Sequence, residues 1–267
     1  MYLAENFIME LIAIVVGLIL LLKGGDWLMK SAVAISLGLN ISRFVIGMTV
    51  VSFATSAPEL IVSIQAAVSG FPDLAFGNVI GSNIANLAFV LAIIIMISPI
   101  NVGENFYKKD WPMMMGATIL FYLFIVFDKE LNRYEGIIMV LILFIFLFYL
   151  IKFQKSDNID DVVDDEKRLT IFNTLIYLFL GGFSLWLGSE VLVQGAVELA
   201  MKLGVSERII SISVVSIGTS IPELSASIIA IANKEKAISL GNLIGSNIFN
   251  ILAVMGITAS IMPIKPV

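Results

Sequence analysis

Carboxyl, hydroxyl and amide side chains occur in two closely similar phrases of an otherwise apolar sequence. The first phrase, residues 47–59, reads GMTVVSFATSAPE, and residues 211–223 read SISVVSIGTSIPE. A second phrase follows each of them, GNVIGSNIAN at 77–86 and GNLIGSNIFN at 241–250. One offset of 164 residues superposes both pairs without a gap. The recurrence predicts an internal repeat that uses the same polar groups twice, inside segments where such groups are costly and usually functional.

The two phrases offer only oxygen ligands, with Glu59 and Glu223 as the carboxylates. The chain has no histidine and no cysteine, which excludes imidazole and thiolate ligands, Ser-His-Asp triads and HExxH zinc sites. Oxygen donors suit hard cations, and calcium or sodium fits a dry site better than magnesium, which dehydrates reluctantly. One calcium ion would neutralise both carboxylates, and sodium ions could replace it. Such competition for one pair of charges is the physical basis of an exchanger.

Pro58 and Pro222 are expected to break or kink the helices that carry these carboxylates. Proline has no N–H, and its ring clashes with the carbonyl four residues earlier. Broken backbone persists inside a membrane only where it is buried in protein or lines a cavity. We therefore expect the backbone oxygens just before each proline to serve as additional cation ligands. They belong to Ser52, Ala54, Ser216 and Gly218.

The second phrase of each repeat is expected to interrupt a helix at its glycines, Gly77 and Gly81 in the first copy. Ser82 and Asn86 are four residues apart and therefore lie on one face of a helix, and Ser246 with Asn250 repeats this spacing. For any single hydroxyl, tight helix packing or a bond to its own helix is an equal alternative. For the two glutamates the alternative is a buried protonated or paired carboxyl. Asp26 and Glu190, which also match across the repeat, are interpreted as interfacial or helix-capping residues.

Composition places these motifs in an all-α integral membrane protein. Of 267 residues, 59% are hydrophobic and 14% are charged, with a mean hydropathy of +1.00. The apolar runs lack a period of two, which favours helices over a barrel, and the first run is too long for a signal peptide. No basic patch indicates nucleic-acid binding. We expect eight transmembrane helices, at roughly 8–36, 41–69, 74–98, 111–128, 134–153, 170–201, 206–233 and 237–262.

The distribution of basic residues predicts the orientation of these helices. Loops on one side carry nine lysines and arginines, and those on the other side carry five. The richer side is expected to be cytoplasmic. The prediction is therefore a multi-pass protein of the plasma membrane with its N-terminus outside.

Matching helices of the two copies are five spans apart, so the second copy is inverted in the membrane. This inverted-repeat pattern is typical of secondary transporters with broken helices and a midplane site. We assign residues 1–154 to the first repeat, 155–168 to an acidic cytoplasmic linker and 169–267 to the second repeat. The linker is interpreted as a solvated connector, since its acids lack EF-hand spacing. Ten helices are expected by this logic, and the eight present are interpreted as a truncation after Pro266, the alternative being that this member of the group lost its two peripheral helices.

The phrases SFATSAPE and SIGTSIPE, each followed by GNxIGSNIxN, resemble the two alpha-repeats of the sodium/calcium exchanger family, within the cation/calcium exchanger superfamily. The resemblance implies ten helices, with helices 1 and 6 forming a mobile bundle. It implies calcium ligands at Glu59 and Glu223 with Thr55 and Thr219 beside them. It also implies sodium sites at Ser56, Ser82, Asn86, Ser220, Ser246 and Asn250, and at the backbone of Ser52 and Ser216.

The expected function is secondary antiport of calcium against sodium, by alternating access and without a bound cofactor. The partners expected are the two ions and the lipid bilayer. No P-loop sequence indicates ATP use.

Asn250 replaces the aspartate of potassium-dependent relatives, which disfavours potassium coupling, and the short loops resemble the prokaryotic type. Proton/calcium exchange is the alternative, and a cation channel fits the inverted symmetry less well. An intramembrane enzyme is disfavoured because no histidine or other activated nucleophile accompanies the carboxylates.

Overall fold

The computed structural model describes residues 2–100, 104, 106–153, 169–205 and 218–265, and this part of the chain is helical. An isolated bridge joins Leu131 to Ile264, and no β-strand occurs among the described residues. The all-α prediction is therefore confirmed. The expected linker at 155–168 and Ser216 lie outside the described residues.

The first repeat consists of helices joined by short turns, with three π-helical segments labelled η. Its elements are α1 (Tyr2–Leu39), α2 (Arg43–Ile46), η1 (Gly47–Val51), α3 (Ser52–Val68), α4 (Pro72–Ala85), η2 (Asn86–Val90), α5 (Leu91–Ile97), η3 (Phe106–Asp110), α6 (Trp111–Asp128) and α7 (Arg133–Phe153). The second repeat contains α8 (Ile171–Lys202), α10 (Ile221–Ala232), α11 (Lys236–Phe249), η4 (Asn250–Met255) and α12 (Gly256–Ile261).

Seven of the eight predicted spans correspond to helical stretches that are long and apolar enough to cross a membrane. The eighth prediction, 206–233, is represented by α10, an apolar helix of 12 residues. The residues before Gly218 in that span are not among those described. The chain is thus a multi-pass membrane protein.

Of the break or kink predicted at Pro58, the break is wrong, because α3 runs through this proline. A membrane helix tolerates the loss of one N–H donor when neighbouring groups compensate. The irregular turn lies immediately earlier, in η1. In the second copy α10 begins at Ile221 with Pro222 in its first turn, where a missing N–H costs nothing, so the interruption predicted there is confirmed.

The predicted interruptions at the glycines are also wrong. Helix α4 continues through Gly77 and Gly81, and α11 continues through Gly241 and Gly245. The irregular turns begin instead at two residues related by the repeat, Asn86 in η2 and Asn250 in η4. At Gly245 the reason for glycine is close packing, since an added Cβ would lie 2.4 Å from the backbone oxygen of Met48.

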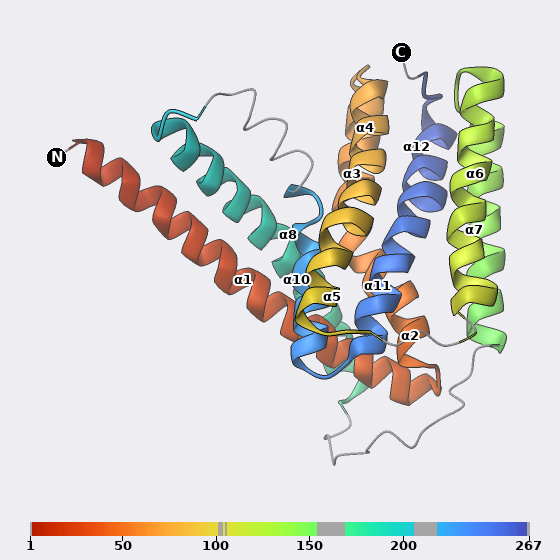
Figure 1. The fold of residues 1–267 in the computed structure, drawn as a ribbon, viewed down its shortest axis with the longest axis horizontal. Helices are drawn as coiled ribbons and strands as arrows, with labels where there is room; N and C mark the ends of the chain where they lie inside the picture. Colours follow the sequence, from red (N-terminus) through yellow and green to blue (C-terminus); the bar gives the residue numbers. More distant parts are fainter. Residues whose placement is uncertain (1, 101–103, 105, 154–168, 206–217, 266–267) are drawn as a thin grey trace.

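Two helices from different repeats form a pair that lies at a slant to the rest of the molecule. Figure 1 shows α1 and α8 running side by side, while α3, α4, α6, α7 and α12 stand roughly parallel to one another. Glycines let the pair approach closely, as in many membrane helix pairs. A Cβ added to Gly188 would lie 2.9 Å from the backbone nitrogen of Leu21, and one added to Gly24 would lie 2.9 Å from that of Leu185.

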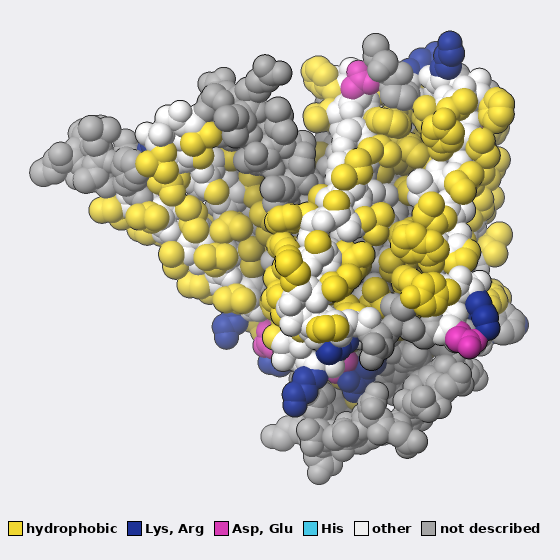
Figure 2. Space-filling model, viewed as in Figure 1, with side chains coloured by type: hydrophobic (Ala, Val, Ile, Leu, Met, Phe, Trp, Pro, Cys, Tyr) yellow, Lys and Arg dark blue, Asp and Glu magenta, His cyan; other side chains and the backbone are white. Residues whose placement is uncertain are grey.

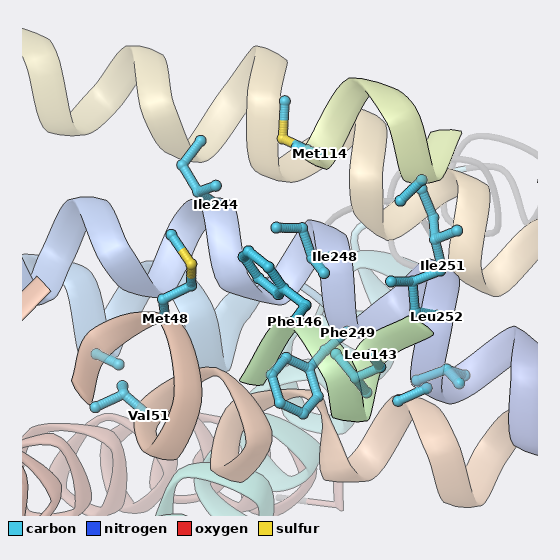
Figure 3. Packing of buried hydrophobic residues seen from close by; sticks show 14 of the residues in the cluster. Met48, Val51, Met114, Leu143, Phe146, Ile244, Ile248, Phe249, Ile251 and Leu252 are labelled. Atoms are coloured by element: carbon cyan, nitrogen blue, oxygen red, sulfur yellow. The ribbon is translucent and has the colours of Figure 1, made fainter. Parts of the chain in front are cut away.

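The core surrounds the last helix of the second repeat. Every residue from Ile238 to Gly256 is buried, and α6 and α7 pack along this stretch. Figure 3 shows Met114 of α6 and Phe146 of α7 beside Ile248 and its neighbours on α11 and η4. The equivalent helix of the first repeat, Pro72–Ile97, is much more exposed. The inverted repeat therefore gives related helices in different surroundings.

The outer surface has the pattern of a membrane-spanning bundle. In Figure 2 apolar side chains cover the middle of the visible face, and charged side chains gather towards its two ends. At one end Arg43 pairs with Glu235, and Lys236 donates to the Pro99 backbone oxygen at 3.2 Å. These contacts join loops that the sequence assigned to one side of the membrane.

We predict that Gly188→Val separates α1 from α8 and lowers the thermal unfolding midpoint of the detergent-solubilised protein. The added side chain has no space, and overpacking of this kind costs about 1–3 kcal/mol. The matched control is Gly116→Val in α6, where no described atom lies within 4 Å of the added Cβ. An equal loss of stability in both variants would contradict the close packing of the pair.

Candidate cation site

The structure brings the two repeat-related carboxyls together in the protein interior. Glu59 lies on α3 and Glu223 in the first turn of α10, with exposed fractions of 1% and 0%. One turn before Glu59, Thr55 donates to Asn242, and the Asn242 amide nitrogen donates to the Glu223 backbone oxygen, so a short series of contacts connects the two glutamates. None of their four carboxyl oxygens has a hydrogen-bond partner among the described residues. Unpartnered buried carboxyls are expensive, so this pair requires compensation by a proton or a cation.

Asparagines hold the backbone at each glutamate in the same way. The amide nitrogen of Asn78 donates to the Glu59 backbone oxygen at 3.3 Å and to Ser63 Oγ at 3.0 Å. Its repeat mate, Asn242, donates to the Glu223 backbone oxygen at 3.4 Å and to Ser227 Oγ at 3.0 Å. These bonds fix α3 against α4 and α10 against α11. The matching geometry is the inverted symmetry at atomic detail.

Hydroxyl contacts join the two repeats across the site. Thr55 Oγ1 lies 3.3 Å from Ser246 Oγ, and the mated contact joins Thr219 Oγ1 to Ser82 Oγ at 3.0 Å. Thr55 also donates to Asn242 Oδ1 at 3.2 Å. Thus helices that carry the carboxylates contact those that carry the GSN phrases of the opposite repeat.

Three other serines predicted for the site differ in whether their hydroxyls have hydrogen-bond partners. The Ser52 hydroxyl is used in packing, because it donates to the backbone oxygens of Gly47 and Asn242 at 2.9 and 3.0 Å. The Ser220 hydroxyl donates to the Ser82 backbone oxygen at 3.5 Å. In contrast, Ser56 Oγ is buried and, among the described residues, has no hydrogen-bond partner.

The two asparagines at the start of the π segments are fully buried. Neither amide atom of Asn86 has a partner in the described part of the chain, and the same is true of Asn250 Oδ1. A π turn at a functional site is a common arrangement. The site therefore contains amide oxygens as well as carboxylates.

Three asparagines of the site were not singled out from the sequence: Asn78, Asn242 and Asn83. Their signal was present, because Asn78 and Asn242 occupy the same place in the repeated GN phrases, and Asn83 stands in the GSN phrase. By contrast, Asp26 and Glu190 pair locally on exposed helix surfaces. Lys30 contacts Asp26 at 2.8 Å, and Gln194 donates to Glu190 at 2.8 Å.

The donor chemistry of the site fits a hard cation. Its unpartnered groups are carboxyl, amide and hydroxyl oxygens, apart from the Asn86 nitrogen. Within the described ranges no cluster of three or more acidic, histidine or cysteine side chains occurs, so the local charge is set by the two glutamates. A pair of carboxylates matches the charge of one divalent ion or two monovalent ions.

Comparison with known proteins agrees with this geometry. The sequence profile described as "Sodium/calcium exchanger protein" matches residues 9–152 and 173–267. The chain belongs to the sodium/calcium exchanger family. The exchanger-type resemblance inferred from the repeated phrases is therefore confirmed, and the protein is a cation antiporter of that type.

Individual relatives in this family align over nearly the whole chain. The putative antiporter CaxA of Alkalimonas amylolytica is 39% identical over 258 residues, which cover 94% of this chain and 81% of the relative. The sodium/calcium exchanger MaX1 of Methanosarcina acetivorans is 29% identical, with 97% and 84% covered. Structures of the sodium-calcium exchanger NCX_Mj superpose with a TM-score of 0.82 at 30% identity, covering 97% of this chain and 84% of theirs.

We predict that Asn242→Leu destabilises the protein more than Asn78→Leu does. Within the described ranges the Asn242 side chain contacts four buried groups, whereas the Asn78 side chain bonds with two. Each orphaned buried partner costs about 1–3 kcal/mol. Thermal unfolding of the two purified variants in one detergent measures the difference, and a larger loss in Asn78→Leu would contradict the assigned contacts.

Proposed function

We propose that this chain exports calcium from the cell in exchange for sodium that enters down its gradient. The observation that carries the proposal is the pair of buried carboxyls, Glu59 and Glu223, whose oxygens have no partner among the described residues. Family membership supports exchange as the type of transport. The ions, the ligands and the direction are our inference.

Charge explains why the two ions would alternate. An ionised carboxylate at the bilayer centre costs at least about 2.5–3.5 kcal/mol on insertion scales, and two adjacent ones repel each other. One calcium ion or two sodium ions cancels this charge. A pocket without a cation is unfavourable, so the protein switches the access of the site from one side of the membrane to the other only when the site is occupied. This requirement couples the two fluxes without ATP.

The ligand assignment follows the geometry and the repeat. We assign calcium to Glu59 and Glu223, with Thr55 and Thr219 beside them. We assign sodium to subsites around this pair, formed by hydroxyl and amide oxygens and by backbone carbonyls near the helix irregularities. These subsites use Ser56, Ser82, Asn86, Ser220, Ser246 and Asn250, and the backbone of Ser52 and Ser216.

Access to the site would alternate by movement of α1 and α8 relative to the remaining helices. Support comes from their slanted position and from the glycine packing that holds them together as one unit (Figure 1). We place residues 1–154 and 169–267 as the two repeats in the plasma membrane, with the N-terminus outside. The joined loops at Arg43, Pro99 and Glu235 would then face the cytoplasm.

The proposal predicts that vesicles containing the purified chain take up calcium when sodium is loaded inside and absent outside. Uptake should stop when the sodium gradient is abolished by an ionophore. A pH step imposed without sodium is the second arm of the experiment. Uptake that ignores sodium and follows the pH step would replace the proposal with proton/calcium exchange.

Glu59→Gln and Glu223→Gln are each expected to reduce this uptake at least a hundredfold, because a neutral amide cannot balance a divalent ion. The control is Glu130→Gln in the α6–α7 turn, where Glu130 contacts Lys265 at 2.7 Å. This variant should transport at the normal rate. Near-normal uptake by either site variant would show that its carboxylate is not a calcium ligand.

A further inference from the structure

Asn83 is the central member of a hydrogen-bonded chain of amides between α4 and the α11–η4 junction. Its nitrogen donates to the backbone oxygen of Asn247 at 3.2 Å, and its Oδ1 accepts from the Asn250 amide nitrogen at 3.1 Å. These bonds connect the two repeats through residues of their GNxIGSNIxN phrases.

The donors and acceptors in this series of hydrogen bonds allow only one orientation of each amide. The backbone oxygen of Asn247 can only accept, so Asn83 must present its nitrogen there. The opposite atom of the Asn83 amide is then an oxygen, which can also only accept. Asn250 must therefore face Asn83 with its nitrogen, and its own oxygen is directed elsewhere. This assignment depends on acceptor chemistry and not on distinguishing oxygen from nitrogen by position.

The oxygen that results is buried and available. Asn250 has an exposed fraction of 0%, and its Oδ1 has no partner within the described ranges. One helical turn earlier on the same face, Ser246 contacts Thr55, which donates to the Asn242 side chain that also holds the Glu223 backbone oxygen. The orientation set by Asn83 therefore presents an oxygen on the face that carries the site.

The first repeat has no equivalent of this arrangement. Asn247, the mate of Asn83, donates instead to the backbone oxygen of Leu243 in its own helix, at 2.7 Å. Asn86, the mate of Asn250, has no hydrogen bond from either amide atom among the described residues. One amide is thus fixed in orientation and its mate is not.

We propose that Asn83 is a positioning residue that holds Asn250 with its oxygen towards the transported cation. Without this contact the Asn250 amide would turn freely and present its nitrogen to the ion for part of the time. This inference rests on the proposed cation site, but it concerns ion binding and does not require that the ion be exchanged for sodium.

The test is calcium binding by the purified full chain in detergent, measured by calorimetry in sodium-free buffer. Asn83→Leu, of similar size, should weaken calcium binding about tenfold. Asn83→Asp keeps both contacts as the neutral acid, because its O–H can donate to the Asn247 backbone oxygen while its other oxygen accepts from Asn250, so its affinity should stay within about threefold of the original. Asn132→Leu is the control for stability alone, because Asn132 accepts from the Tyr134 and Glu135 backbone nitrogens at the distant α7 start.

A double-mutant cycle separates positioning from a general structural effect. In an Asn250→Ala background, Asn83→Leu should cause no further loss beyond about twofold, because the group that it orients is gone. The proposal is overturned if the two substitutions weaken calcium binding independently, so that their effects multiply in the double variant. It is also overturned if Asn83→Leu alone changes the affinity less than twofold, or if the unmodified protein binds no calcium. If binding follows the expected pattern while vesicle uptake ignores sodium, only the proposed exchange function fails.

Discussion

Two carboxyl groups that share one buried site impose the main constraint on this molecule. Glu59 and Glu223 are shielded from water and contact no basic side chain among the described residues. Their burial is tolerable only with a compensating positive charge or proton. The surrounding structure supports this burial by tying the backbone of each glutamate to an asparagine of the adjacent helix. Within the described residues no basic side chain supplies that charge, which is consistent with a proton or a bound cation at the pair.

The inverted repeat explains how these parts meet. Because corresponding helices run in opposite directions, the residues of one copy face those of the other across a pseudo-two-fold axis. Thr55 then contacts Ser246, and Thr219 contacts Ser82, through related geometry. Helices α1 and α8 also come from different copies and pack through glycines. Duplication thus provided both the site and the helix pair beside it.

Much of this was predictable from sequence because membrane helices and repeats leave clear patterns. Seven spans, the inversion and the meeting of Glu59 with Glu223 followed from hydropathy, from the offset and from the cost of buried carboxylates. Helix irregularity was less predictable. Pro58 stays inside α3, and the π turns at Asn86 and Asn250 depend on how neighbouring helices satisfy the backbone. Local sequence does not contain that information. The amide contacts of Asn83 likewise arise only from tertiary packing.

The different treatment of Asn86 and Asn250 bears on the history of the chain. In a dimer of identical single repeats, each substitution appears in both halves, so neither half can change alone. Fusion into one polypeptide removes this restriction, and each gene half then accumulates its own substitutions. At the amides themselves the two halves still match, since positions 83, 86, 247 and 250 are all asparagine, so the orphaned amide in one copy and the anchored amide in the other reflect different surroundings. Strict symmetry, once needed for assembly, becomes dispensable after fusion.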